Sequence, residues 1–127
     1  MTVPDAVESL IADAPLSAHL ATAADDRPHV APVWYDYHDG RLRLLTGGRK
    51  LENVERNPRV AVSIEEADGP AVEWSVTLLG TARIVEDPDH VREVSRRINA
   101  KYRGEDVGDA AGPMIEVEIG STTVQRY

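Results

Sequence analysis

The residues with the clearest chemical potential lie in one segment, Thr46-Gly47-Gly48-Arg49-Lys50. A hydroxyl, two glycines and two cations at the start of an expected helix are the components of a phosphate-binding turn. Glycine lets the backbone approach an anion, the free N–H groups of the first helical turn point at it, and Arg49 and Lys50 add charge-assisted hydrogen bonds. The spacing of a Walker loop is absent. A strand-to-helix turn with solvated cations is the alternative, and on spacing alone the two interpretations stand level.

The distribution of charge favours the phosphate. The 127 residues carry 14 Lys+Arg and 22 Asp+Glu, a formal net charge of −8. The stretch 41–59 nevertheless carries +4 and the remainder −12, because two glutamates in it face six cations: Arg41, Arg43, Arg49, Lys50, Arg56 and Arg59. A positive segment in an acidic protein suggests a small anionic ligand. Nucleic acid is not an expected partner, since phosphate neutralisation along a polymer needs a basic face.

A second segment, Val30-Ala31-Pro32-Val33-Trp34-Tyr35, could accommodate a flat ligand. Proline inside a strand lacks a ladder donor, so Pro32 marks an edge, a bulge or a barrel opening. A planar molecule can lie against such an exposed backbone, with Trp34 stacking on it or walling the pocket. The alternative, favoured by composition alone, is that Trp34 is a core residue near the mouth of a barrel.

Other chemistry finds little support. Cysteine is absent, which excludes disulfides, thiolate metal sites and cysteine nucleophiles. No pair among the four histidines, His19, His29, His38 and His90, has the spacing of a metal-ligand motif, so no metal site is predicted. The serines and threonines are interpreted as sheet residues, and no catalytic side chain is assigned.

These segments require strands and short helices to position them. Turn residues and apolar alternation predict strands over 16–23, 29–37, 41–46, 59–65, 71–79, 81–86 and 114–119, with 122–127 as a further candidate. Helices are expected over 4–13, 49–57 and 88–102. Gly80 is expected to separate two strands, and Glu116 and Glu118 are expected to face outward.

Six or seven short antiparallel strands with an N-terminal helix, a short helix at the phosphate site and one longer helix predict a small β-barrel of the all-β/α+β class. No repeat or linker interrupts 1–127, so one domain is expected. No apolar run approaches the ~20 residues that span a bilayer, and the N-terminus carries no basic segment. A cytoplasmic protein without a membrane partner is therefore expected.

An ordered set of short motifs makes the chain similar to a known family. The motifs are Leu20-Ala21-Thr22-Ala23, Pro32-Val33-Trp34-Tyr35, Asp39-Gly40-Arg41-Leu42, Thr46-Gly47-Gly48-Arg49-Lys50, Asn57-Pro58-Arg59-Val60 and Leu79-Gly80-Thr81-Ala82-Arg83. Together they resemble the pyridoxamine 5′-phosphate oxidase-like, flavin-binding split-barrel family over residues 16–87. The segment 98–104 is also similar to the helix end in the deazaflavin-dependent branch of that family.

The resemblance implies a split barrel that forms a homodimer, with FMN or the deazaflavin coenzyme F-420 in two equivalent clefts between subunits. Positions matching Val30, Pro32, Val33 and Trp34 would run beside the isoalloxazine ring. Those matching Thr46, Arg49 and Lys50 would hold the phosphate end, with Gly48 leaving room for the anion. The strand containing Trp74 and Ser75 resembles the one that approaches the neighbouring ring from the partner chain.

The expected function is an oxidoreductase that transfers hydride between the cofactor and a small substrate at the dimer cleft, which requires no protein nucleophile. The alternatives are a flavin carrier without turnover and a haem-binding split barrel, for which only the scattered histidines could be axial ligands. The chain lacks the basic C-terminal segment of a true pyridoxamine-phosphate oxidase, so vitamin B6 oxidation is not expected. Residues 120–124 depart from the proline-containing end common in the deazaflavin branch, which leaves the choice of cofactor open.

Overall fold

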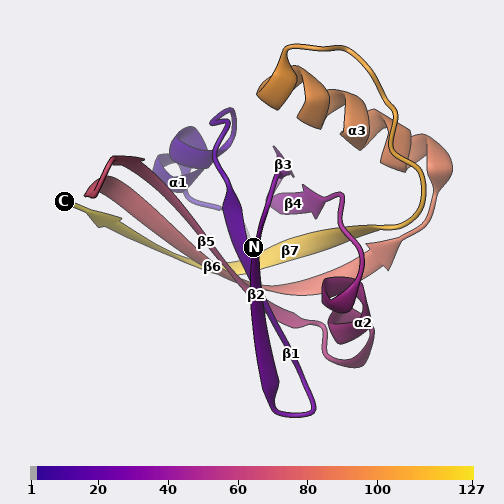
Figure 1. The fold of residues 1–127 in the computed structure, drawn as a ribbon. Helices are drawn as coiled ribbons and strands as arrows, with labels where there is room; N and C mark the ends of the chain where they lie inside the picture. Colours follow the sequence, from indigo (N-terminus) through magenta and orange to yellow (C-terminus); the bar gives the residue numbers. More distant parts are fainter. Residues whose placement is uncertain (1–2) are drawn as a thin grey trace.

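A seven-stranded antiparallel sheet with three helices forms the protein (Figure 1). This computed structural model describes residues 3–127. The strands are β1 Ala18–Ala24, β2 Arg27–Val33, β3 Asp36–His38, β4 Arg41–Leu44, β5 Arg59–Asp68, β6 Ala71–Val85 and β7 Met114–Arg126. The helices are α1 Asp5–Ile11, α2 Arg49–Arg56 and α3 Pro88–Arg103.

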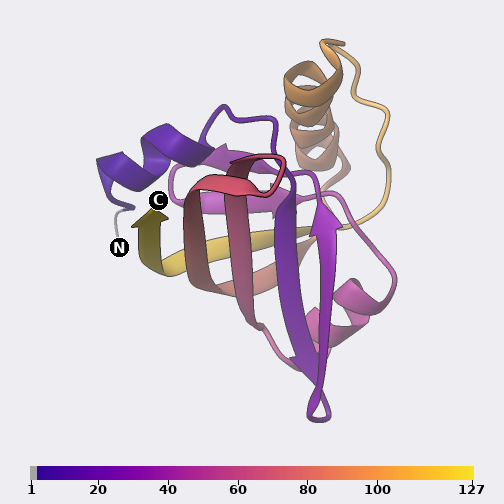
Figure 2. The same cartoon turned by 60° about the vertical axis from the view of Figure 1, so that its left-hand side comes forward.

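The strands follow the order β2-β1-β5-β6-β7-β4-β3, so β2 and β3 are the two edges of an open, strongly curved sheet (Figure 2). The β1–β2 hairpin projects from the body, α1 lies near the C-terminal end of β7, and α3 lies over the other end of that strand (Figures 1 and 2). This arrangement is the small split barrel with three helices that the sequence predicts.

Two predicted strand breaks are wrong. Residues 71–85 form one strand, β6, with only a register irregularity at Leu79/Gly80. A Cβ atom on Gly80 would lie 2.5 Å from the Glu118 carbonyl oxygen, so glycine here permits the close approach of β7 and does not end β6. Residues 114–126 likewise form one strand. The predicted strand 29–37 instead divides, with β2 ending at Val33 and β3 beginning at Asp36.

The main core fills the inside of the curved sheet. Fully buried aliphatic residues from alternating strand positions meet there, among them Leu20, Leu42, Ile64 and Leu78. The chain has no phenylalanine, and Tyr35 is the largest fully buried side chain among residues 3–127. Its hydroxyl donates to the Ile11 carbonyl oxygen at 2.6 Å, which ties the end of α1 to the barrel.

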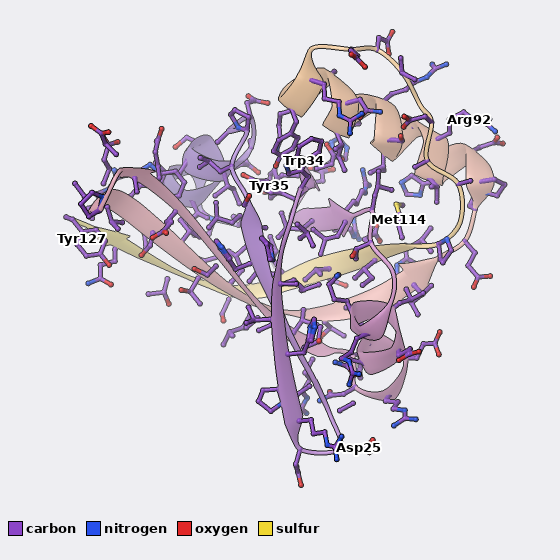
Figure 3. The ribbon with its side chains drawn as sticks, viewed as in Figure 1. Asp25, Trp34, Tyr35, Arg92, Met114 and Tyr127 are labelled. Atoms are coloured by element: carbon purple, nitrogen blue, oxygen red, sulfur yellow. The ribbon has the colours of Figure 1, made fainter. Side chains whose placement is uncertain are left out.

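A second, smaller core lies under α3. The Asp87 carboxylate accepts a hydrogen bond from the Asp89 backbone N–H, Pro88 occupies the first turn, and Gly104 ends the helix with φ +69°. The helix buries Val91, Val94 and Ile98 in one cluster with Met114. Met114, at the start of β7, is labelled below α3 in Figure 3. This end of β7 is therefore covered on both faces.

The expectation that Glu116 faces outward is wrong, because Glu116 is only 3% exposed. The residue lies on the part of β7 that is covered on both faces. Register places Asp36, Arg43, Glu116 and Arg83 side by side across β3, β4, β7 and β6, and we call these four residues the charge row. Glu116 accepts hydrogen bonds from Arg43 Nε at 3.1 Å and from Arg83 Nη2 at 2.7 Å. Arg97 of α3 extends the row, donating from Nε to Asp36 at 2.9 Å. Alternating charge thus pairs both buried carboxylates with arginines, although Asp36 Oδ2 has no hydrogen-bond partner among residues 3–127.

Candidate functional site

The turn before α2 has the conformation that the phosphate-binding hypothesis needs. The helix begins at Arg49, directly after Gly48, as predicted. Gly48 has φ +66° and ψ −140°, a conformation that is costly for any residue with a side chain. No side chain caps the helix, and no described atom lies within 4 Å of where a Gly48 Cβ would be. The N–H groups of the first turn consequently have no side-chain cap within residues 3–127.

A cavity of about 420 Å³ lies between α2 and the β1–β2 hairpin. We call it the hairpin cavity; its charged lining residues are Asp25, Arg27, Arg49, Glu52 and Arg56. Three arginines against two carboxylates give this lining a net charge of +1. Arg56 is paired with Asp25 at 2.5 Å, whereas Arg27 and Arg49 have no side-chain partner among residues 3–127. Two cations therefore remain available to an anion.

His29 supplies a polar group to the same cavity. The residue is half-buried and lines the hairpin cavity, yet its Nδ1 is buried without a hydrogen-bond partner among residues 3–127. A buried polar atom without a partner is costly unless something satisfies it. A phosphate oxygen would satisfy Nδ1 when that nitrogen carries the proton. The hairpin cavity therefore fits the phosphate end of a cofactor.

The structure brings only part of the predicted phosphate turn to this cavity. Arg49 lines it, but Thr46 lines a separate, mainly apolar cavity of about 370 Å³ with Leu51 and Pro113. Lys50 is half-buried and lines neither of these two cavities. Gly48 lies between Thr46 and Arg49 in the sequence. Thr46 and Arg49 thus lie on two different sides of the start of α2.

The positive stretch 41–59 is also divided. Arg41 and Arg43 lie near Glu116, at 3.9 and 3.1 Å, and so belong to the charge row and its surroundings. Of the cations in the stretch 41–59, only Arg49 and Arg56 of α2 line the hairpin cavity. Sequence reasoning missed Arg27 and His29, which come from β2 and complete the lining. Their position directly after a hairpin turn and before the exposed segment at Val30 was the available signal.

The edge strand β2 connects the hairpin cavity to the second predicted segment. Val30 is 65% exposed, and Pro32 is exposed on the same side of the strand, while Val33 is half-buried on the other. Trp34 lies at the α3 end of the strand and Asp25 at the opposite, hairpin end (Figure 3). The second predicted segment therefore forms one edge that runs from the hairpin cavity at His29 to Trp34.

Trp34 is an exposed residue of this edge. It is 41% exposed, which rules out the alternative of a core residue. Its ring stacks on Tyr102 with centroids 4.5 Å apart and planes at 5°, and the Arg103 guanidinium lies 5.3 Å from its centroid. Burial raises the pKa of the Tyr102 hydroxyl to about 12 and keeps it neutral, and it donates to the Leu16 carbonyl oxygen at 2.6 Å. Tyr102 thus fixes the orientation of Trp34.

Trp74 and Ser75 lie on opposite faces of β6. Trp74 is 6% exposed, and its indole Nε1 donates to Glu66 at 3.0 Å, so the ring belongs to the main core. Ser75 is half-buried on the other face. The prediction that this strand approaches a partner's cofactor therefore rests on Ser75 rather than on Trp74.

Two further observations bear on the class of site. Within residues 3–127, no three histidine or acidic side chains gather closely enough to hold a metal ion. No helix in that same range combines the length and the apolar character needed to cross a membrane.

Comparison with known proteins now identifies the family. The family described as pyridoxamine 5′-phosphate oxidase matches residues 4–127. The chain belongs to this family. No curated protein gave a match. A solved F420 reductase is similar to this oxidase-family chain at 29% identity and TM-score 0.74, covering 95% of this chain and 98% of that one.

Two other solved structures support the fold. A FAD-binding protein from Mesorhizobium loti shares 23% identity at TM-score 0.73 and covers 98% of this chain and 95% of its own. A conserved hypothetical protein from Mycobacterium tuberculosis shares 23% identity at TM-score 0.83, and the match covers 99% of this chain and 86% of that one. At these identities the likeness concerns the split barrel of the oxidase family.

Proposed function

We propose that this protein is an oxidoreductase that binds a flavin-type cofactor and transfers hydride between it and a small substrate. The observation that carries the proposal is the hairpin cavity beside α2, where Arg27, Arg49 and the His29 Nδ1 atom have no side-chain partner among residues 3–127. Family membership supports the same chemistry. When bound, a flavin or deazaflavin supplies the hydride-carrying ring.

The roles of the chain's own residues follow from their placement. Arg49 and Arg27 would hold the phosphate through charge-assisted hydrogen bonds, and the N–H groups at the start of α2 would add to them. The exposed side of β2 at Val30 and Pro32 would lie beside the ring. Trp34, held by Tyr102, would close the far end of that edge. Lys50 would add positive charge near the phosphate without lining the cavity.

Two cofactors fit this arrangement. FMN and the deazaflavin coenzyme F-420 both carry a phosphate, so the hairpin cavity does not discriminate between them. The similarity to the F420 reductase, at 29% identity, favours the deazaflavin. Because the cavity accepts either phosphate, the proposal covers both FMN and F-420. The visible absorption spectrum of the purified protein, with the released cofactor identified by its mass, distinguishes flavin from deazaflavin and from haem; a haem spectrum would contradict the proposal.

A second copy of the chain is the proposed partner. Two cross-strand rows on the outer face of β2, β1, β5, β6 and β7 contain no charged side chain, although 28% of the chain is charged. The rows are Val30, Ala21, Ala61, Leu79 and Ser121, and Pro32, His19, Ser63, Thr77 and Thr123. Leu79 is 54% exposed there. Two acidic chains can approach through such a face with little repulsion, so we propose a homodimer burying more than ~1,200 Å².

The phosphate assignment is tested with Arg49→Ala and two ligands. A hydrogen bond to a charged group contributes about 1.5–3 kcal/mol, so the variant should bind FMN or F-420 about 10- to 100-fold more weakly. Riboflavin lacks the phosphate and should bind the wild type weakly, with almost no change in the variant. Arg59→Ala is the matched control, since Arg59 is exposed in the same positive stretch but lines neither cavity at α2. Equal small losses for FMN and riboflavin would remove the assignment.

A further inference from the structure

A third cavity, separate from the proposed cofactor site, lies between the α1–β1 linker, β3 and α3. Its volume is about 470 Å³, and we call it the α3 cavity. Its charged lining residues are Asp13 from the linker, Asp36 from β3, and Arg97 and Lys101 from α3. The proposed function assigns no role to any of them.

Lys101 is an unusual lysine within this cavity. Its Nζ is buried and has no hydrogen-bond partner among residues 3–127. It lies 3.6 Å from the centroid of the Tyr35 ring and 4.9 Å from that of Tyr102. Lysine ammonium groups are almost never buried without a paired carboxylate. Here the nearby aromatic faces replace direct pairing, which is a weaker compensation for lost hydration.

The protonation of Lys101 follows from these surroundings. Burial lowers its pKa to about 8, against the opposing effect of the charges on Asp36 and Asp13. At pH 7.5 roughly a quarter of such amines are neutral, compared with roughly one in a thousand for an ordinary lysine. The neutral amine is the nucleophilic form. Lys101 is one of the residues that line the α3 cavity, so its side chain lies at the wall of that space.

We propose that Lys101 is a nucleophilic amine that captures small aldehydes in the α3 cavity as an imine. The amine nitrogen forms a bond to the carbonyl carbon, and the carbonyl oxygen leaves as water with the two amine protons. A proton from solvent then converts the imine to an iminium ion. No oxidant or reductant takes part, and hydrolysis reverses the step.

The surroundings favour an aldehyde over an acylating reagent. An iminium ion keeps the positive charge at nitrogen, where the Tyr35 and Tyr102 rings and the carboxylates of Asp13 and Asp36 stabilise it. Asp36 is 7% exposed, and its Oδ2 lies 3.6 Å from Arg43 Nη1 without a hydrogen bond among residues 3–127, so its charge acts on the iminium through space. Acylation would convert the amine to a neutral amide. The carboxylates of Asp13 and Asp36 would then lose the positive charge that Lys101 provides.

The chain offers an internal control, because Lys50 is its only other lysine. The test is a time course of labelling with propanal and cyanoborohydride at pH 7.5, read by peptide mass at each lysine. Lys101 should be labelled at least tenfold faster than Lys50, and its rate should reach half its maximum near pH 8. In 8 M urea the two rates should become equal, because the selectivity depends on the folded cavity.

A second variant ties the reactivity to the cavity. Ala100→Phe narrows the α3 cavity and should slow labelling of Lys101 severalfold while leaving Lys50 unchanged. Arg96→Phe, also exposed on α3 but outside the lining, should change neither rate. Lys101 labelled no faster than Lys50 in the folded protein, or a selectivity that survives in urea, would overturn the proposal.

Discussion

Replacing Glu116 by glutamine tests whether the charge row stabilises the fold. The carboxylate accepts hydrogen bonds from Arg43 Nε at 3.1 Å and from Arg83 Nε and Nη2 at 2.9 and 2.7 Å. The Arg43 side chain is 13% exposed and that of Arg83 is 69% exposed. We assign about 1.5–3 kcal/mol to the Arg43 bond and less than about 1 kcal/mol to the exposed Arg83 pair. The side-chain amide of the Glu116→Gln variant can accept a hydrogen bond from one arginine through its oxygen. Its NH₂ group then faces the other arginine, where it cannot accept.

The expected loss for Glu116→Gln is therefore about 3 kcal/mol of unfolding free energy, or a fall of about 10 °C in Tm. Urea denaturation at pH 7 measures it. Glu118→Gln is the matched control, because Glu118 lies two residues along the same face of β7 and is exposed. Its loss should stay within about 0.5 kcal/mol.

Acid titration gives the same prediction an independent check. Burial alone would raise the pKa of Glu116, but hydrogen bonds from Arg83 and Arg43 lower it below its ordinary value. A carboxyl whose pKa is lower in the folded state stabilises the fold above its unfolded pKa, and this contribution disappears as pH falls through the folded value. The difference in unfolding free energy between the wild type and Glu116→Gln should therefore become smaller below about pH 4. A loss no larger than that of Glu118→Gln, or a gap independent of pH, would refute the reasoning.

The remaining predictions concern two glycines and the outer face. Gly80→Ala should cost about 2–3 kcal/mol in urea denaturation, because its Cβ would lie 2.5 Å from a carbonyl oxygen, whereas Gly120→Ala, with a nearest atom at 3.3 Å, should cost less. Gly48→Ala should cost about 1–3 kcal/mol for its positive φ, and Gly47→Ala, which has open space and no positive φ, should be nearly neutral by the same assay. Leu79→Asp should shift the sedimentation coefficient from dimer to monomer; a wild type that sediments as a monomer at micromolar concentration would contradict the proposed interface.

Local sequence signals predicted those parts of the fold that depend on neighbouring residues. Asp87 and Pro88 mark the start of α3, and Gly48 marks the start of α2, because capping and left-handed backbone geometry act within a few positions. The expectations that failed depend on distant partners. Gly80 does not end a strand because the backbone at Glu118 passes beside it, and Glu116 is buried because α3 and two arginines cover it.

The candidate site likewise has parts that depend on neighbouring residues and parts that depend on distant ones. The segments around Thr46–Lys50 and Val30–Trp34 could be found from residue type and spacing. Arg27 and His29 could not be joined to Arg49, because about twenty residues separate them and only the fold of the β1–β2 hairpin against α2 brings them together. Lys101 carries no sequence signal of its burial, which depends on the distant Tyr35 between β2 and β3 as well as on the adjacent Tyr102.

The order of the strands has a consequence for the timing of folding. The β1–β2 and β5–β6 hairpins are local and can form as soon as they are synthesised. The pairing of β4 with β7 joins Arg43 to Glu116, 73 residues apart, so β4 emerges from the ribosome long before its partner exists. Closure of this ladder should be the late event, formed after the rate-limiting barrier. Substitutions in the charge row should then speed unfolding and leave the refolding rate nearly unchanged.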